Sequence, residues 1–319
     1  MADNRSELRV PEDIGKLIIM EHSSQGIDLD LVLASLRRDL VVLVRSVSAD
    51  QADGVMHAVA DRLGLSNALK LQAGFASFLG HRYNIGKYFM SVNNRDDYHF
   101  ITPHSEGGSS IGMQLASFFC YENSTDGGET ILMNVDDSSE VWQSLRESVK
   151  KGRLTSGRLP AHEIARARAL YRVNLPADTL KEDDQILEER RTEIAGLTVA
   201  EVLAKPIKTY SCILDRKLYA YWDTVGSIDF DSAQEYAHLL RRCGLLREPA
   251  AGLDVSQMDN AADRRVWHSG VSYALLFKCK ITRKLAPGEL VIQNNMTWTH
   301  AVTNWSPGSG TRKIAACFA

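Results

Sequence analysis

The chain is organised around the stretch Ile101-Thr102-Pro103-His104-Ser105-Glu106-Gly107-Gly108. Side chains alternate between the two faces of an extended segment, so His104 and Glu106, two residues apart, lie on the same face. A neutral imidazole and a carboxylate on one face can bind a single cation. A second histidine from a distant strand would complete a 2-His-1-carboxylate site with open coordination positions, as at Fe(II). Alone, the short pattern is more typical of a surface His and Glu before a glycine turn.

The composition indicates an ordinary globular protein. The chain has 319 residues, enough for one large core, and we expect a single domain over 1–319. Its net charge of −3 provides no electrostatic footprint for nucleic acid. No apolar run approaches the ~20 residues of a membrane span, and the N-terminus lacks the apolar region of a secretion signal. Five scattered cysteines without a C-x-x-C pair fit a reducing cytoplasm. We expect a cytoplasmic protein, and leave its oligomeric state open.

Strand and turn patterns dominate after an α/β opening. Periodicity and capping residues predict a helix over 28–38, a buried strand over 39–45 and a second helix over 48–63. From about residue 79, short apolar segments separated by Gly, Pro and Asn turns predict many strands. This pattern favours a mainly β (α+β) fold, with a double-sheet jelly roll (double-stranded β-helix) as its core and helical additions.

The region from about 150 to 206 differs from both of its flanks. It is rich in Arg, Glu, Asp and Ala, with short patches of helical character at 161–169 and 187–194. We expect a helical insertion on the main domain. It is either a lid over the site or a surface decoration without a part in substrate binding.

Three residues outside the opening stretch bear on its chemistry. His300 follows an apolar strand and an Asn-containing turn, which places an imidazole at a strand start, although a structural role suits a lone histidine better. Arg312 opens the last apolar strand. A fixed arginine on a core strand is costly unless it binds an anion, and its fork matches a carboxylate. Thr130, on the strand after two glycines, adds a hydroxyl donor.

Together these residues resemble the taurine dioxygenase and clavaminate synthase (TauD/TfdA-like) superfamily of Fe(II)/2-oxoglutarate-dependent oxygenases. The family pattern is H-x-D/E, then G-G-x-T, then a distal His, then an Arg on the final strand. It is matched in order by His104-Ser105-Glu106, Gly127-Gly128-Glu129-Thr130, His300 and Arg312. The resemblance covers roughly residues 75–135 and 205–319, and four weak motifs in order make a fairly specific signal.

The resemblance implies a dioxygenase of small molecules, and the net charge and the lack of a long apolar run predict no nucleic-acid or membrane partner. By it, His104, Glu106 and His300 bind Fe(II), while Arg312, helped by Thr130, binds the distal carboxylate of 2-oxoglutarate. O2 is the second co-substrate, and succinate and CO2 are released. A Glu ligand in place of the commoner Asp resembles the amino-acid-hydroxylating branch, which favours an amino acid or an amino-acid-derived metabolite of secondary metabolism. Because this carboxylate is present, hydroxylation, desaturation or cyclisation is favoured over halogenation.

Several alternatives remain open from the sequence. Lys313 replaces Arg312 if the strand register is off by one, because neighbours on a strand face opposite ways. Gln114, Arg265 and His268 are candidates for substrate contact, the last two because they form a polar cluster just before a core strand. The competing classes are a cupin-like metal-dependent isomerase or lyase that does not use 2-oxoglutarate, and a non-enzymatic binding protein with a degenerate site.

Overall fold

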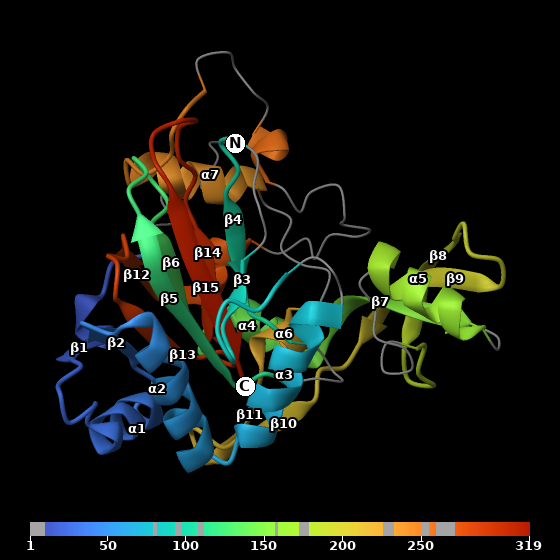
Figure 1. Ribbon diagram of the computed structural model, residues 1–319. Coiled ribbons are helices and arrows are strands. Elements are labelled where there is room, and N and C mark those ends of the chain that lie inside the picture. Colours follow the sequence, from blue (N-terminus) through green and yellow to red (C-terminus); the bar gives the residue numbers. More distant parts are fainter. Residues whose placement is uncertain are drawn as a thin grey trace.

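A computed structural model of the chain describes residues 10–78, 82–92, 97–107, 112–156, 159–171, 179–225, 233–249, 255–259 and 272–319. Two β-sheets form its centre (Figure 1). The larger sheet has six strands in the order β1-β2-β13-β5-β15-β3. Their bounds are Leu17–Glu21 for β1, Val41–Arg45 for β2, Leu290–Asn294 for β13, Leu115–Asn123 for β5, Arg312–Phe318 for β15 and Met90–Ser91 for β3.

The smaller sheet has four strands in the order β12-β6-β14-β4. Their bounds are Phe277–Arg283 for β12, Thr130–Val135 for β6, Trp298–Val302 for β14 and Ile101–His104 for β4. One apolar cluster takes side chains from the inner faces of both sheets, including Phe118, Leu132, Ile281, Trp298, Ile314 and Phe318. Two mainly antiparallel sheets packed over a shared core, with strands from both ends of the chain interleaved, confirm the predicted jelly roll.

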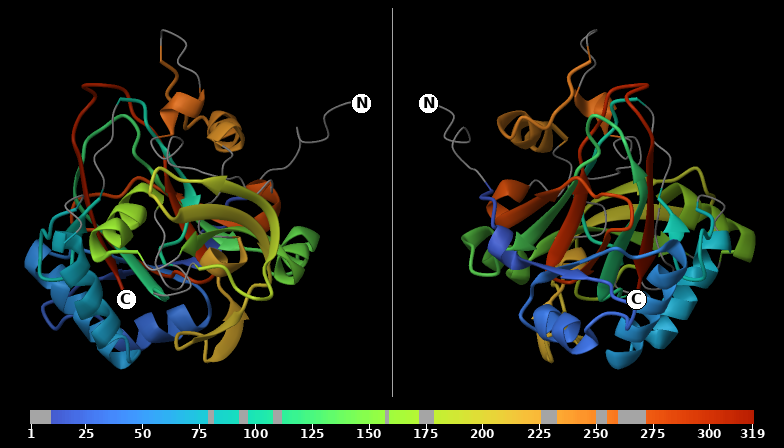
Figure 2. Two further views of the ribbon diagram at one scale, coloured as in Figure 1. Left: turned by 90° about the vertical axis from the view of Figure 1, so that its right-hand side faces the viewer. Right: turned by 60° about the vertical axis from the view of Figure 1, so that its left-hand side comes forward.

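Helices cover the outer face of each sheet (Figure 2). The N-terminal helices pack on the six-stranded sheet, and the later ones on the four-stranded sheet. The second helix begins, as predicted, at Ser48, whose side chain forms a capping box with Gln51. No described helix has both the length and the apolar character that a membrane span needs. The bounds are Leu29–Arg37 for α1, Ala49–Arg62 for α2, Ser66–Phe78 for α3, Glu140–Glu147 for α4, Tyr221–Thr224 for α6 and Ala233–Arg242 for α7, with short 3-10 turns at Ile14–Lys16, Val255–Met258 and Tyr273–Leu276.

The expected helical insertion over 150–206 is wrong in its main feature. It is a three-stranded antiparallel sheet in the order β7-β9-β8 with one helix, α5, and it projects from the core (Figure 1). The patch at 187–194 falls largely in β8, all of whose residues are exposed. An edge strand can keep charged side chains in water while its backbone pairs with β9, so its charge run resembles a solvated helix face. The bounds are Val149–Ser156 for β7, Ala161–Tyr171 for α5, Gln185–Arg191 for β8 and Leu197–Ala204 for β9.

A buried ion pair fastens the insertion to the core. The Nζ atom of Lys151, in β7, lies 2.5 Å from Oδ1 of Asp223, in α6, and both residues are buried. The other oxygen of Asp223 accepts a hydrogen bond from the backbone N–H of Ile207, at 2.8 Å. The chain then forms the hairpin of β10 (Lys208–Ser211) and β11 (Arg216–Tyr219).

Candidate metal centre

Two histidines meet across neighbouring strands of the smaller sheet. His104, the last residue of β4, pairs directly with His300 in β14. Their ring centroids are 4.2 Å apart. On its other side His300 pairs with Leu132 of β6, so it stands on a central strand and His104 on an edge strand. The register of the sheet therefore brings the two imidazoles together.

Glu106 completes a group of three donors. Its Oε1 lies 3.9 Å from Nε2 of His104. One ligand atom from each of His104, Glu106 and His300 falls within 4.8 Å of the others. His104 and Glu106 lie two residues apart and face the same point, in agreement with the alternation expected from the sequence. Two imidazoles and one carboxylate are the donor set of a mononuclear site with open positions.

The hydrogen bonds around His104 suit a metal ligand. Its Nδ1 lies 2.9 Å from the carbonyl oxygen of Thr102, which accepts a hydrogen bond from the ring. A proton held on Nδ1 leaves the lone pair of Nε2 facing Glu106 and His300. Metal-binding histidines are commonly oriented in this way, by a backbone carbonyl on the far ring nitrogen.

His300 is held as a neutral imidazole. Burial, assisted by the neighbouring His104 and by the Arg82 guanidinium, keeps its pKa well below the usual range, and a neutral ring is the form that binds a metal. Phe118 and Phe318 lie against the ring, with centroids 4.6 Å and 6.2 Å away. Among the described residues its buried Nδ1 has no hydrogen-bond partner. A buried polar atom of this kind is costly unless something else satisfies it, and a cation held by this imidazole fits that need.

Arg82 lies beside the group of donors and was missed from the sequence. Its Nη2 is 3.4 Å from Oε1 of Glu106, and both side chains are about three-quarters buried. Its Nη1 also lies 3.8 Å from the sulfur of Met90. No motif links Arg82 to Glu106, so only the folded chain reveals this cation next to the carboxylate.

Arg312 lies inside the jelly roll, and Lys313 lies outside it. Arg312 shares its face of β15 with Ile314, which belongs to the core between the sheets. Lys313 is exposed, and its Nζ lies 5.5 Å from the ring centroid of Tyr121. Of the two cations that the sequence left as alternatives, the structure therefore directs Arg312 inward.

The guanidinium of Arg312 has few protein partners. Its Nε donates to the carbonyl of Gly128, at 3.1 Å, and its Cζ lies 5.8 Å from the ring centroid of Trp305. Within the described part of the chain, no carboxylate forms an ion pair with it. Burial lowers its pKa to about 10, which leaves it charged at neutral pH. Because a charge withdrawn from water requires a counter-charge, this position fits an anionic ligand.

The turn at Gly127 and Gly128 brings Arg312 to the end of β6. A Cβ on Gly127 would lie 2.0 Å from the carbonyl oxygen of Asn304. A Cβ on Gly128, whose φ is +72°, would lie 2.8 Å from Cδ of Arg312. Thr130 is buried and begins β6 two residues after the carbonyl that Arg312 binds, on the same strand face as Leu132. The two glycines thus allow the close approach that brings Arg312 and Thr130 to one end of the barrel.

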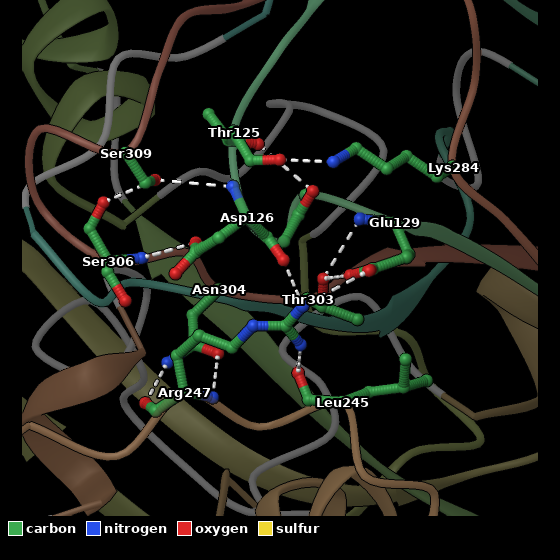
Figure 3. A network of polar contacts seen from close by, with 12 residues as sticks. Thr125, Asp126, Glu129, Leu245, Arg247, Lys284, Thr303, Asn304, Ser306 and Ser309 are labelled. Atoms are coloured by element: carbon green, nitrogen blue, oxygen red, sulfur yellow. Dashed lines mark hydrogen bonds and ion pairs between the residues drawn. The ribbon is translucent and has the colours of Figure 1, made fainter.

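Glu129, between Gly128 and Thr130 in the sequence, forms an ion pair with a different arginine, Arg247 (Figure 3). Nη2 of Arg247 lies 3.5 Å from Oε1 of Glu129, whose other oxygen accepts a hydrogen bond from the hydroxyl of Thr303. The backbone N–H of Arg247 donates to the side chain of Asn304, at 2.9 Å. Because Arg247 forms the ion pair with Glu129, the nearby charge of Arg312 is left for another partner.

Of the substrate residues suggested by the sequence, only Gln114 lies in the described part of the chain, and its side chain contacts a hairpin. The amide of Gln114 donates to the carbonyl of Tyr210, at 3.1 Å, and accepts from the N–H of Cys212, at 2.9 Å. These contacts tie Gln114 to the β10–β11 hairpin. Arg265 and His268 lie outside the described residues.

Comparisons with known proteins reveal only distant similarity. No family model and no curated protein matches the sequence. Among solved structures, the chain is similar to PvcB from Pseudomonas aeruginosa, with 10% identity, a TM-score of 0.44 and coverage of 97% of this chain and 89% of that one. It is also similar to a Burkholderia xenovorans protein assigned as an alpha-ketoglutarate dependent 2,4-D dioxygenase (12%, TM-score 0.38) and to AAD-2 in complex with Mn(II) and N-oxalylglycine (13%, TM-score 0.39), each covering 95% of this chain and 93% of that one. At this distance, similarity assigns neither ligand nor activity to this chain.

Proposed function

We propose that this protein is an Fe(II)- and 2-oxoglutarate-dependent dioxygenase that oxidises a small molecule. The observation that carries the proposal is the convergence of one donor atom each from His104, Glu106 and His300 within 4.8 Å. Fe(II) bound by two histidines and a carboxylate supplies the redox chemistry for oxidising a C–H bond, and keeps open positions for a 2-oxo acid and O2. The role of the protein is to hold these three donors, to keep His300 neutral and to exclude water from one side of the ring with Phe118 and Phe318.

In the same proposal, Arg312 and Thr130 bind the distal carboxylate of 2-oxoglutarate. Arg312 is a cation directed into the barrel without a described carboxylate partner, and its fork can bind both oxygens of such a group. Thr130 adds a hydroxyl on a neighbouring strand. Leu132, which pairs with His300, lies two residues along β6 from Thr130, or roughly 7 Å. This spacing suits a short dicarboxylate that reaches from Arg312 to the metal ligands.

In the proposed reaction, 2-oxoglutarate loses CO2 and becomes succinate, which gains one oxygen atom of O2. The second oxygen atom enters the substrate in a hydroxylation, or leaves as water when the substrate loses two hydrogens in a desaturation or cyclisation. An amino acid or an amino-acid derivative is the proposed substrate class. The Glu106 ligand favours it, and the Arg82 cation beside Glu106 suits a substrate that carries a carboxylate.

Two measurements test the proposal. The first is the visible spectrum of the protein with Fe(II) and 2-oxoglutarate under anaerobic conditions, where a weak charge-transfer band is expected. The second is succinate release in air across a panel of amino acids and derivatives, followed by the mass of the product. Metal binding without the band and without succinate would instead favour an isomerase or lyase that does not use 2-oxoglutarate.

Neighbouring residues on β15 supply a matched pair of variants. Arg312→Ala removes the inward cation and should abolish the band at 2-oxoglutarate concentrations that saturate the wild type. Lys313→Ala removes the outward cation one residue away and should leave the band unchanged. Equal effects of the two substitutions would exclude Arg312 as the carboxylate-binding residue.

A further inference from the structure

Asn295 lies in the turn between β13 and β14, and its side chain is fully buried. Its Nδ2 donates to the carbonyl of Glu106, at 2.7 Å, and to the carbonyl of Met113, at 2.8 Å. Its Oδ1 accepts from the backbone N–H of Glu106, at 3.2 Å. Both protons and the oxygen of the carboxamide are therefore used, and two of the three hydrogen bonds go to one residue.

Asn295 pairs with Glu106 as a neighbouring strand would. Its amide meets both the N–H and the C=O of Glu106, although β4 ends at His104. Immediately afterwards the chain turns at Gly107, with a φ of +122°, a conformation that favours glycine. The Asn295 side chain thus continues the backbone pairing beyond the end of β4, as far as Glu106.

The amide also connects different parts of the candidate site. Asn295 precedes β14, which carries His300, and its backbone N–H donates to the carbonyl of Gln114, at 2.8 Å. The bond to Met113 attaches it to the segment that leads into β5. The Asn295 side chain therefore joins the turn before β14, which carries His300, to the backbone of Glu106. Displacement of Glu106 would break two hydrogen bonds inside the protein.

We propose that Asn295 is a positioning residue for Glu106: it holds the backbone of this ligand so that its carboxylate is directed at His104 and His300. The inference rests on the proposed function, because it assumes that these three residues bind a divalent metal. Residues that orient metal ligands typically contribute about 10- to 100-fold to metal affinity. We expect Asn295→Ala to raise the dissociation constant for Mn(II) by that factor.

The preceding residue provides the matched control. Asn294 is also fully buried, but its side chain accepts from the N–H of Met296, at 3.0 Å, and donates to Asp39, at 3.5 Å. Asn294→Ala removes an amide of the same size and burial from the adjacent position, and no contact with a metal ligand is lost with it. Titration of each variant with Mn(II), followed by the electron paramagnetic resonance signal of the free ion, gives the dissociation constant without any turnover.

A second variant separates positioning from folding. Asn295→Asp keeps the volume and the acceptor, but loses both donors and directs a carboxylate at two carbonyl oxygens. It should also weaken Mn(II) binding, while circular dichroism shows a folded chain. Weakening by Asn295→Ala and Asn295→Asp but not by Asn294→Ala supports the inference, whereas equal effects at 294 and 295, or none at 295, overturn it.

The outcomes also separate the two proposals. Wild-type protein that binds no Mn(II) would overturn both, because no ligand set would then need positioning. Wild-type protein that binds Mn(II) tightly and depends on Asn295, yet forms no succinate with Fe(II), would overturn the proposed oxygenase reaction alone.

Discussion

His300 and His104 face each other across antiparallel strands, with ring centroids 4.2 Å apart, but their surroundings differ. His300 is on a central strand, buried against Phe118 and Phe318. His104 is on the edge strand, where its side chain is 30% exposed, close to the 23% of Glu106. Of the three proposed ligands, His300 is thus fixed by the core, and the other two are held at the rim by contacts of the backbone.

Metal removal should lower the stability of the protein. A ligand that binds only the folded state adds about 2.7 kcal/mol at 100 times its dissociation constant. We expect thermal unfolding to shift upward with Mn(II) and back with EDTA, and His300→Gln to abolish that shift. The exposed His238 on α7 supplies the control, because His238→Gln should respond to Mn(II) like the wild type. A shift that survives in His300→Gln would place the metal elsewhere.

Gly128 should be intolerant of alanine for two separable reasons. Its φ of +72° costs an L-residue about 1–2 kcal/mol, and its Cβ would lie 2.8 Å from Cδ of Arg312. Gly308 has a similar φ, +69°, with nothing within 4 Å of an added Cβ. Denaturant unfolding should therefore detect a lower free energy of unfolding in both alanine variants, with the larger decrease for Gly128→Ala. Only Gly128→Ala should also weaken the band with 2-oxoglutarate. Unchanged 2-oxoglutarate affinity in this variant would contradict the close contact with Arg312.

The buried thiols should resist alkylation in the folded protein. Burial raises the pKa of Cys120 to about 11 and also raises the pKa values of Cys279 and Cys317, while the thiolate is the reactive form. Cys243 is exposed. With iodoacetamide at pH 8, peptide mass spectrometry should detect early labelling of Cys243, and labelling of the three buried thiols only after denaturation. Early modification of Cys120 would contradict its place between the sheets.

Part of the candidate site was predictable because the placement of its side chains depends on local periodicity. Alternation placed His104 and Glu106 on one face, and parity along the last strand placed Arg312 and Lys313 on opposite faces. The contacts of Arg82 and Asn295 with Glu106 could not be predicted from the sequence, because only the fold brings these residues together and no sequence spacing indicates it. The register of β14 against β4, which brings His300 to His104, is likewise a long-range property.

The insertion shows why composition can mislead. The Glu and Arg residues near 188–191 have good helix propensity, and a solvated helix face is their usual setting. Here they belong to β8, where pairing with β9 decides the backbone conformation. The alternation in β9 contained the strand signal: the buried Leu197 and Val199 are separated by the less buried Thr198, and the buried Val202 and Ala204 by the less buried Leu203. Tertiary pairing overrode local preference in β8.

Breaking the Lys151–Asp223 ion pair should be costly. Asp223→Asn would leave a buried cation without its counter-charge, a change that typically costs about 3 kcal/mol. Burial already lowers the pKa of Lys151, so loss of its proton limits the cost. Arg190→Ala, which removes an exposed pair with Glu188, should change stability little. Urea unfolding of the two variants measures the contrast, and similar midpoints would mean that the buried pair does not anchor the insertion.

The two ends of the insertion lie side by side, since Val149 in β7 pairs with Ala204 in β9. The polypeptide therefore leaves the barrel and returns to it at nearly one point. A segment of this geometry can lengthen, shorten or be exchanged in evolution while the strands that carry the proposed metal ligands keep their spacing. The projecting sheet is, in this sense, a separable addition, which can change without altering the barrel that carries the candidate site.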